Sequence, residues 1–268
     1  MKERILTASV ILPIFILIML TNSYPVLFSF IGALSLLGVK EYYKSFKSLD
    51  KFFNLTGLLG TIIFIFIVFP DLNNRFIPFL IIFSFVVLGI SIFKYSKRSL
   101  IKASITILGI LYVPFLLFFV LSVYSIDKWG YFLTWLIFLI SWSTDSFACI
   151  VGSIIGKRKI TPILSPKKSL EGFIGGTLFT TIICSILGYA LVFLGYTNSK
   201  MFVVFCLTVG FFGSIMAQIG DLVASAIKRI NHIKDFGTIF PGHGGILDRF
   251  DSVLFVAPTI YLIAQVLF

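Results

Sequence analysis

Long apolar stretches separated by short polar segments make up most of this chain. A membrane-spanning helix needs about 20 mostly apolar residues to cross a hydrocarbon core roughly 30 Å thick. The first apolar run is interpreted as a span, because no small-residue cleavage site of a secretory signal follows it. The pattern therefore predicts an all-α, polytopic membrane protein with about nine spans. The expected helices are 5–21, 24–39, 53–70, 76–93, 103–125, 129–151, 173–195, 202–227 and 250–267.

Composition agrees with this pattern. The 268 residues are 58% hydrophobic and 12% charged, whereas about 25% of the residues of a soluble domain are charged. The connections between the apolar runs are too short to hold a soluble domain of useful size.

The basic residues predict the orientation, because Lys and Arg are retained on the cytoplasmic side of a membrane. Of the 22 Lys and Arg residues, all except Arg75, Lys128 and Lys200 fall in one alternating set of segments. This places the N-terminus in the cytoplasm and the C-terminus outside. The net charge of +11 is largely explained by topology and by attraction to anionic lipid. Nucleic acid is not expected as a partner, because the positive charge is divided among short loops.

The two halves of the chain differ in character. Residues 1–128 are expected to form membrane scaffold helices that contact lipid or another subunit. A homodimer is therefore one of the expected possibilities. Residues 129–268 are expected to form a catalytic membrane region with cytoplasmic loops at 157–172 and 228–249. This second half carries Asp145, Asp221, Asp248 and Asp251 within or beside apolar helices.

Asp221 lies about 10 Å inside the end of its predicted helix. A carboxylate at that depth costs a few kcal/mol unless something compensates it. One interpretation is a salt bridge to Arg229 or another basic group, and the favoured one is a metal ligand.

Asp248 and Asp251 are three residues apart and share one face at the start of the last helix. Acidic residues also stabilise a first helical turn through the helix dipole, and for Asp251 that explanation is as good as catalysis. Asp248 directly follows a glycine-rich turn, and it is the stronger candidate. Asp145, within Thr144-Asp-Ser146, is a third candidate for the same polar cavity.

The turn reads Phe240-Pro-Gly-His-Gly-Gly245. Its glycines permit positive φ and close backbone approach, and exposed N–H groups leading into a helix suit a phosphate. His243 is a candidate for orienting phosphate or for acid–base chemistry, and a structural histidine is equally compatible. An upstream polar segment, Ser165-Pro-Lys-Lys-Ser-x-Glu-Gly172, places hydroxyls, paired cations and a carboxylate before a new helix.

These residues resemble a known family signature. The run Ser225-x2-Lys228-Arg229-x4-Lys234-Asp235-x-Gly237-x2-Phe240-Pro241-x-His243-Gly244-Gly245-x2-Asp248-Arg249-x-Asp251 is similar to that of the phosphatidate cytidylyltransferases, also called CDP-diacylglycerol synthases. The segments around Ser165–Gly172 and Asp145 look like two further elements of that family. In the first half, the resemblance extends only to hydrophobicity.

The resemblance implies transfer of CMP from CTP to phosphatidic acid, which yields CDP-diacylglycerol and pyrophosphate for phospholipid biosynthesis. It implies a bacterial cytoplasmic membrane enzyme whose site faces the cytoplasm. Mg²⁺ is expected on Asp221 and Asp248, with Asp145 and Asp251 as further candidates and room for a second cation of unassigned identity. Lys228 and Arg249 are expected to act in catalysis. The expected substrate contacts are Ser165, Lys167, Lys168, Glu171, Arg229, Lys234, His243 and Gly244.

Two other classes of function remain open from the residues. A CTP-dependent lipid kinase of the polyprenol type would transfer the γ-phosphate instead. An ion-coupled transporter would use the intramembrane carboxylates to bind an ion, although no repeated pair of broken helices marks inverted halves.

Overall fold

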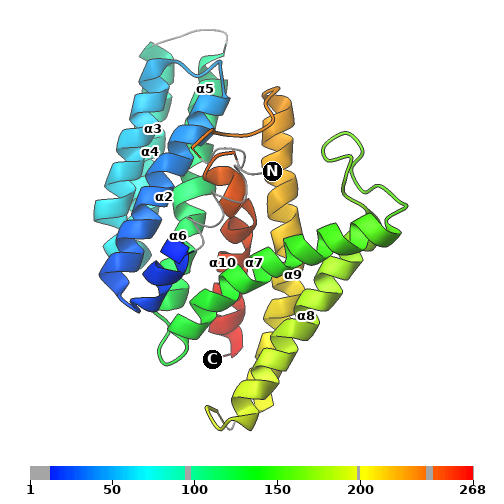
Figure 1. The fold of residues 1–268 in the computed structure, drawn as a ribbon. Coiled ribbons are helices and arrows are strands. Elements are labelled where there is room, and N and C mark those ends of the chain that lie inside the picture. Colours follow the sequence, from blue (N-terminus) through cyan, green and yellow to red (C-terminus); the bar gives the residue numbers. More distant parts are fainter. Residues whose placement is uncertain (1–12, 94–97, 198–199, 240–243, 268) are drawn as a thin grey trace. The chain divides into compact units, whose positions relative to one another are not determined.

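The computed structural model describes residues 13–93, 98–197, 200–239 and 244–267. In these residues the chain is helical throughout, and the described part contains no strand. Residues 13–20 are helical, whereas the rest of the predicted first span lies largely outside the described residues. The helices that follow, shown in Figure 1, are α2 (Tyr24–Ser45), α3 (Lys51–Ile63), α4 (Leu72–Phe93), α5 (Ser99–Ile110), α6 (Leu116–Tyr124), α7 (Gly130–Ile155), α8 (Leu170–Phe193), α9 (Lys200–Ile230) and α10 (Leu247–Leu267).

The predicted membrane architecture is confirmed at the level of fold class. The described residues include eight helical stretches that are long and apolar enough to cross a membrane. They correspond one by one to the predicted runs from 24–39 to 250–267. Two predicted spans are single stretches built from several helical segments. A π-helical turn and a 3₁₀ turn (Phe64–Val68 and Phe69–Asp71) continue α3, and a π-helical turn (Leu111–Phe115) joins α5 to α6.

Proline accounts for the irregular turn between α5 and α6. Pro114 lies inside this turn, and proline has no N–H to donate to the preceding turn of an α-helix. The widened π-helical turn accommodates this loss without ending the span. A continuous apolar run therefore still produces one crossing.

The described helices belong to two compact units. The first unit comprises Met1–Phe118 and Ile230–Arg249, and the second comprises Phe119–Arg229 and Phe250–Phe268. Spatial packing thus groups the segment Ile230–Arg249 with the first half of the chain. The predicted division of function at residue 128 stays a prediction.

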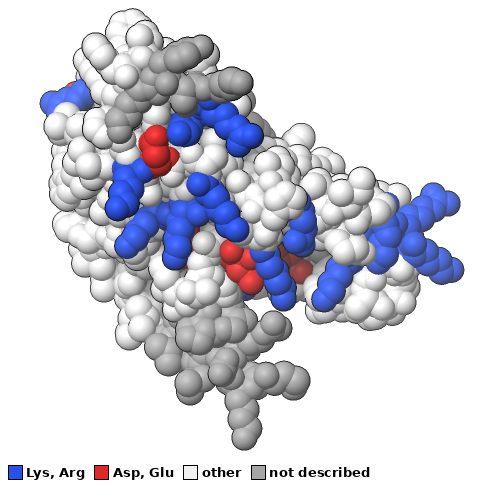
Figure 2. Space-filling model, turned by 90° about the horizontal axis from the view of Figure 1, so that it is seen from above, with Lys and Arg blue, Asp and Glu red and all other residues white. Residues whose placement is uncertain are grey.

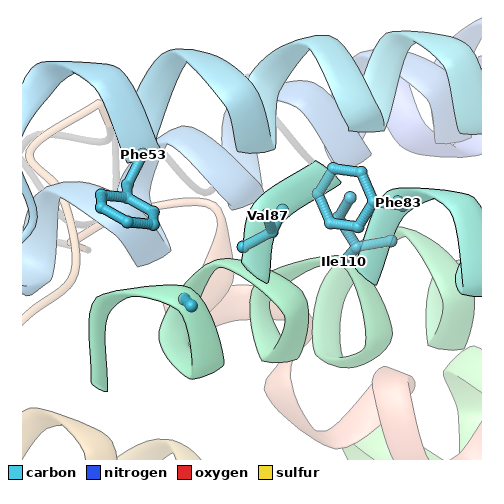
Figure 3. Close-up of a cluster of buried hydrophobic side chains, with 5 residues drawn as sticks. Phe53, Phe83, Val87 and Ile110 are labelled. Carbon is cyan, nitrogen blue, oxygen red and sulfur yellow. The ribbon is translucent and has the colours of Figure 1, made fainter. Parts of the chain in front are cut away.

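The core of the first unit is aromatic and aliphatic. Phe53 from α3, Phe83 and Val87 from α4, and Ile110 from α5 lie together in Figure 3, and Ala103 completes this cluster. Tyr43 of α2 is 1% exposed, and its hydroxyl donates a hydrogen bond to the Thr106 carbonyl oxygen at 2.7 Å. This bond satisfies the one polar atom of a buried ring and ties α2 to α5.

The second unit packs its helices through small residues. A Cβ at Gly176 of α8 would come within 3.0 Å of the Ala148 side chain of α7, and a Cβ at Gly210 of α9 would come within 2.8 Å of the Cys184 side chain of α8. Helices in a membrane associate largely by such close approach. Lipid tails are as apolar as the side chains, so the hydrophobic effect does not drive the helices together. Hydrogen bonds between helices add to the packing, with the Gln218 amide donating to the Thr177 hydroxyl at 3.1 Å.

Filling the space beside Tyr43 is expected to destabilise the first unit. The Tyr43 ring lies directly against Gly57 and Gly109, where a Cβ would overlap ring atoms. Overpacking of this kind typically costs about 1–3 kcal/mol. Gly109→Ala should therefore lower the thermal unfolding midpoint of the detergent-solubilised protein.

The matched control is Gly89→Ala. A Cβ at Gly89 meets no atom within 4 Å, so alanine there should leave the midpoint unchanged or raise it, since alanine is the better helix former. An unfolding midpoint for Gly109→Ala equal to that of Gly89→Ala would show that the Tyr43 ring can move aside without cost.

Candidate active site

A cavity of about 560 Å³ lies in the second unit, between the C-terminal half of α7, the loop that follows it, the start of α8, and α9. This volume is within the range of roughly 300–1,000 Å³ that is typical of ligand sites. Its polar lining is formed by Asp145, Ser153, Lys159, Ser165, Lys167, Lys168, Ser169, Gln218 and Asp221. The structure thus brings five predicted site residues to one cavity, namely Asp145, Ser165, Lys167, Lys168 and Asp221.

The loop between α7 and α8 is held closed by backbone bonds and a helix cap. Lys159 and Ser169 form an isolated antiparallel bridge, and the Leu170 N–H donates to the Arg158 carbonyl oxygen at 2.8 Å. The Ser169 hydroxyl caps α8 by accepting the Gly172 N–H at 3.2 Å. This closed loop holds Lys167 and Lys168 over the cavity.

Glu171 has a local role that sequence reasoning did not anticipate. Its carboxylate accepts the backbone N–H of Lys157 at 3.0 Å and that of Arg158 at 3.2 Å. A carboxylate in the first turn of α8 also complements the helix dipole. These contacts tie the start of the loop to its end. The predicted contact of Glu171 with substrate stays a prediction.

Three carboxylates from three helices gather in the second unit. Asp251 of α10 is 7% exposed and lies within electrostatic reach of Asp145 of α7, Asp221 of α9, and Lys228. The Ser252 hydroxyl donates to the Asp145 carboxylate at 3.4 Å, and the Ser252 N–H donates to the Asp251 carboxylate at 2.8 Å. Carboxylates this close repel one another, so this cluster depends on nearby cations and hydrogen-bond donors.

Lys168 compensates Asp221 directly. The Lys168 ammonium lies 2.5 Å from the Asp221 carboxylate, and both side chains are about a third exposed or less. Of the two interpretations open from the sequence, the structure therefore contains the salt bridge, and the partner is Lys168. The Nε of Arg229 instead donates to the Leu164 carbonyl oxygen at 3.2 Å. The predicted role of Asp221 as a metal ligand stays a prediction.

The donor chemistry of this cluster suits a hard divalent cation. Mg²⁺ prefers carboxylate oxygens, and it usually shares them with water and substrate phosphates. Within the described ranges, no group of three or more His, Cys, Asp or Glu side chains has the arrangement of a complete metal site. The carboxylates therefore fit the ion by donor type and not by their arrangement in this structure, where Lys168 pairs with Asp221.

The glycine-rich turn and Asp248 belong to the first unit. One oxygen of the Asp248 carboxylate accepts the Phe236 N–H at 2.8 Å and the Gly245 N–H at 2.9 Å. Gly244 has φ +82°, which is a conformation that favours glycine, as the turn predicted. Lys234 and Arg249 are exposed. Phe240 to His243 lie outside the described residues, so the roles predicted for His243 stay predictions.

Glu41 is a functional candidate that the sequence analysis missed. It lies near the end of α2, is 5% exposed, and accepts the backbone N–H groups of Ile246 at 3.0 Å and Leu247 at 2.9 Å. The apolar run ends at residue 39, and Glu41 follows Lys40 in a segment that reads as a charged loop. The helix in fact continues to Ser45. The sequence did contain one indication of this role: an acidic residue about one helical turn before the last charged residue of the helix.

Comparison with known proteins gives concordant results. Residues 2–267 match the Cytidylyltransferase family. Proteins named phosphatidate cytidylyltransferase are similar to this chain over almost their whole length. The protein from Staphylococcus aureus (strain COL) is 35% identical over 269 residues, covering 98% of each chain. The protein from Staphylococcus epidermidis (strain ATCC 35984) is 36% identical over 270 residues, again covering 98% of each chain.

Removing the cap of α8 is expected to loosen the loop above the cavity. Ser169→Ala deletes the acceptor for the Gly172 N–H, and loss of such a cap costs about 1 kcal/mol. That corresponds to a roughly fivefold larger open fraction of the loop. Limited trypsin digestion of the solubilised protein should therefore cut faster after Lys157, Arg158 and Lys159.

Ser153→Ala is the matched control, because the Ser153 hydroxyl donates to the Ile150 carbonyl oxygen at 2.8 Å, within its own helix and not across the loop. Its cleavage rate should equal that of the unmodified protein. Equal rates for both variants would mean that the cap does not hold the loop.

Proposed function

The chain belongs to the cytidylyltransferase family, and we infer that it transfers CMP from CTP to phosphatidic acid, giving CDP-diacylglycerol and pyrophosphate. The observation that carries this conclusion is the similarity of the whole chain, at 35–36% identity, to proteins named for that activity. The chain is thus a nucleotidyltransferase that uses CTP and phosphatidate. The lipid kinase and the transporter are not favoured.

The reaction balances as a single substitution at phosphorus. An oxygen of the lipid phosphate attacks the α-phosphorus of CTP and forms a new P–O bond. The bond from the α-phosphorus to the oxygen that bridges to the β-phosphate breaks, and pyrophosphate leaves with that electron pair. The attacking oxygen is already anionic, so the protein contributes mainly by positioning the phosphates and stabilising their charge.

The cavity of the second unit offers the cations for this task. Lys159, Lys167 and Lys168 line it together with Ser165, and we propose that they contact phosphate oxygens of the substrates. Lys168 would exchange its Asp221 partner for a phosphate. Lys228, Arg229, Lys234 and Arg249 remain proposed phosphate contacts from the family signature, as do Gly244 and His243.

Magnesium remains part of the proposal. We propose that Asp221 and Asp248 bind Mg²⁺, with Asp145 and Asp251 as further ligands, and that a second cation can be accommodated. A bound ion would neutralise charge on the triphosphate and on the departing pyrophosphate. Support comes from the chemistry of the carboxylate cluster around Asp251.

The protein is an integral membrane protein, and its side and membrane are proposals. We propose the bacterial cytoplasmic membrane with the site facing the cytoplasm. Support comes from the alternation of basic segments along the chain. On the face drawn in Figure 2, lysine and arginine side chains reach the surface, with a few acidic side chains among them. A homodimer also stays a proposal.

The position of the transferred label tests the reaction. Purified protein is incubated with phosphatidic acid, Mg²⁺ and CTP labelled at either the α- or the γ-phosphate. Label from the α position is expected in the lipid, with pyrophosphate released. Label from the γ position in the lipid would instead identify a kinase, and no transfer from either position would restore the transporter hypothesis.

Neutralising the proposed metal ligands is expected to abolish turnover. Asp221→Asn and Asp248→Asn each remove one carboxylate charge while keeping the side-chain size. Both variants should insert into the membrane and lose at least about 100-fold in kcat, the scale of a lost electrostatic contribution to a transition state.

The control is Asp127→Asn, because Asp127 is exposed in the connection between α6 and α7. It should retain normal kcat. Near-normal activity of purified Asp221→Asn or Asp248→Asn would remove that residue from the proposed metal ligands.

A further inference from the structure

Glu41 is a buried carboxylate in a membrane-spanning helix of the first unit, far in sequence from the family signature. It lies in the last turns of α2 and is 5% exposed. A charged group at such a place is costly unless it is compensated, and residues of this kind are retained where they serve function. The groups that compensate the charge of Glu41 therefore indicate its role.

Both oxygens of the Glu41 carboxylate are used by the start of α10. One accepts the Ile246 N–H at 3.0 Å, and the other accepts the Leu247 N–H at 2.9 Å. The first N–H groups of a helix have no partner within the helix and carry partial positive charge. Glu41 therefore caps α10 from another helix, more than 200 residues away in the sequence.

The chain around this cap is shaped to the carboxylate. A Cβ at Gly237 or at Gly245 would overlap the Glu41 carboxylate, so the backbone approaches it closely on two sides. Neither glycine has positive φ. Glycine is therefore required at these two positions by the close approach of the carboxylate and not by the backbone conformation. Both glycines belong to the family signature, whereas Glu41 lies outside it.

Asp248 is bound to the same short segment of the chain. Its carboxylate accepts the N–H groups of Phe236 and Gly245, and Gly245 immediately precedes the two residues whose N–H groups Glu41 accepts. Lys44 attracts Glu41, and Asp248 lies close enough to repel it. The like charge of Asp248 destabilises the Glu41 carboxylate at this position. A carboxylate that served only to stabilise the fold would be unfavourable there.

We propose that Glu41 is a positioning residue for cytidylyl transfer, which fixes the first turn of α10 and with it Asp248 and Arg249. This inference rests on the proposed function, in which these two residues serve the reaction. Glu41 touches no substrate in this proposal. It fixes the start of α10 to α2 through the two N–H groups that it binds, those of Ile246 and Leu247.

The test compares kcat and KM for Glu41→Gln in purified protein. Glutamine keeps the size of the side chain, removes the charge, and points an NH₂ group at one of the two N–H donors. The start of α10 should shift, and misplacement by about 1 Å can cost 100-fold in rate. We expect kcat to fall about 10- to 100-fold, with KM for CTP and for phosphatidic acid close to normal and the yield of folded protein retained.

Two glycine variants test the same contact from the other side. Gly237→Ala and Gly245→Ala should displace the Glu41 carboxylate and lower kcat as Glu41→Gln does, while Gly89→Ala, which meets open space, should keep normal kcat. In a Glu41→Ala background the clash is absent, so adding Gly245→Ala should cost little more. Such non-additivity is expected of groups that act through one contact.

The outcomes separate the inference from the proposed function. If the unmodified protein moves no α-label from CTP to lipid, the proposed function fails. If it does so and Glu41→Gln keeps normal kcat, the function stands and the positioning role is wrong. If Glu41→Gln does not fold, Gly237→Ala decides, and a normal kcat in that folded variant overturns the inference. Additive losses in Glu41→Ala with Gly245→Ala would also overturn it.

Discussion

Compensation of charge inside apolar helices is the constraint on which this structure depends. A carboxylate at membrane depth cannot rely on water, so each needs a cation or N–H donors nearby. In the second unit, Lys168 serves Asp221, and the Ser252 N–H together with Lys228 serves Asp251. In the first unit, the N-terminus of α10 serves Glu41. These pairings decide where the polar groups lie.

Close backbone approach makes such pairings possible. Glycines on α8 and α9 let the helices of the second unit come together, which brings one carboxylate each from α7, α9 and α10 into a single cluster. Glycines in the signature segment do the same for Glu41 in the first unit. In both units, a small residue at the contact allows a charged residue to reach its partner.

The same arrangement suits the chemistry of the family. A triphosphate and a lipid phosphate are both anionic, so cations near the reacting phosphates stabilise the charge of their reaction. The cavity brings Lys167, Lys168 and Asp221 together in one place. Because the lipid substrate and product stay in the membrane, the site has to be built from membrane helices and the loops at their ends.

The sequence by itself determined the fold class, the positions of eight helical stretches that are long and apolar enough to cross a membrane, and the family. Long apolar runs and a fixed spacing of polar residues are local properties of the chain. The sequence also predicted that Asp145, Ser165–Glu171 and Asp221 share one cavity with the run Ser225–Asp251. The cavity contains Asp145, Ser165 and Asp221, and the part of the prediction that concerns Ser225–Asp251 stays a prediction. Only the tertiary structure decided that Asp221 pairs with Lys168, that Glu171 closes a loop, and that Glu41 caps α10. Each of these depends on which atoms meet across distant segments. Helical periodicity carries no information about such contacts, because a charged residue at the end of an apolar run looks the same whether it faces water or a buried helix terminus.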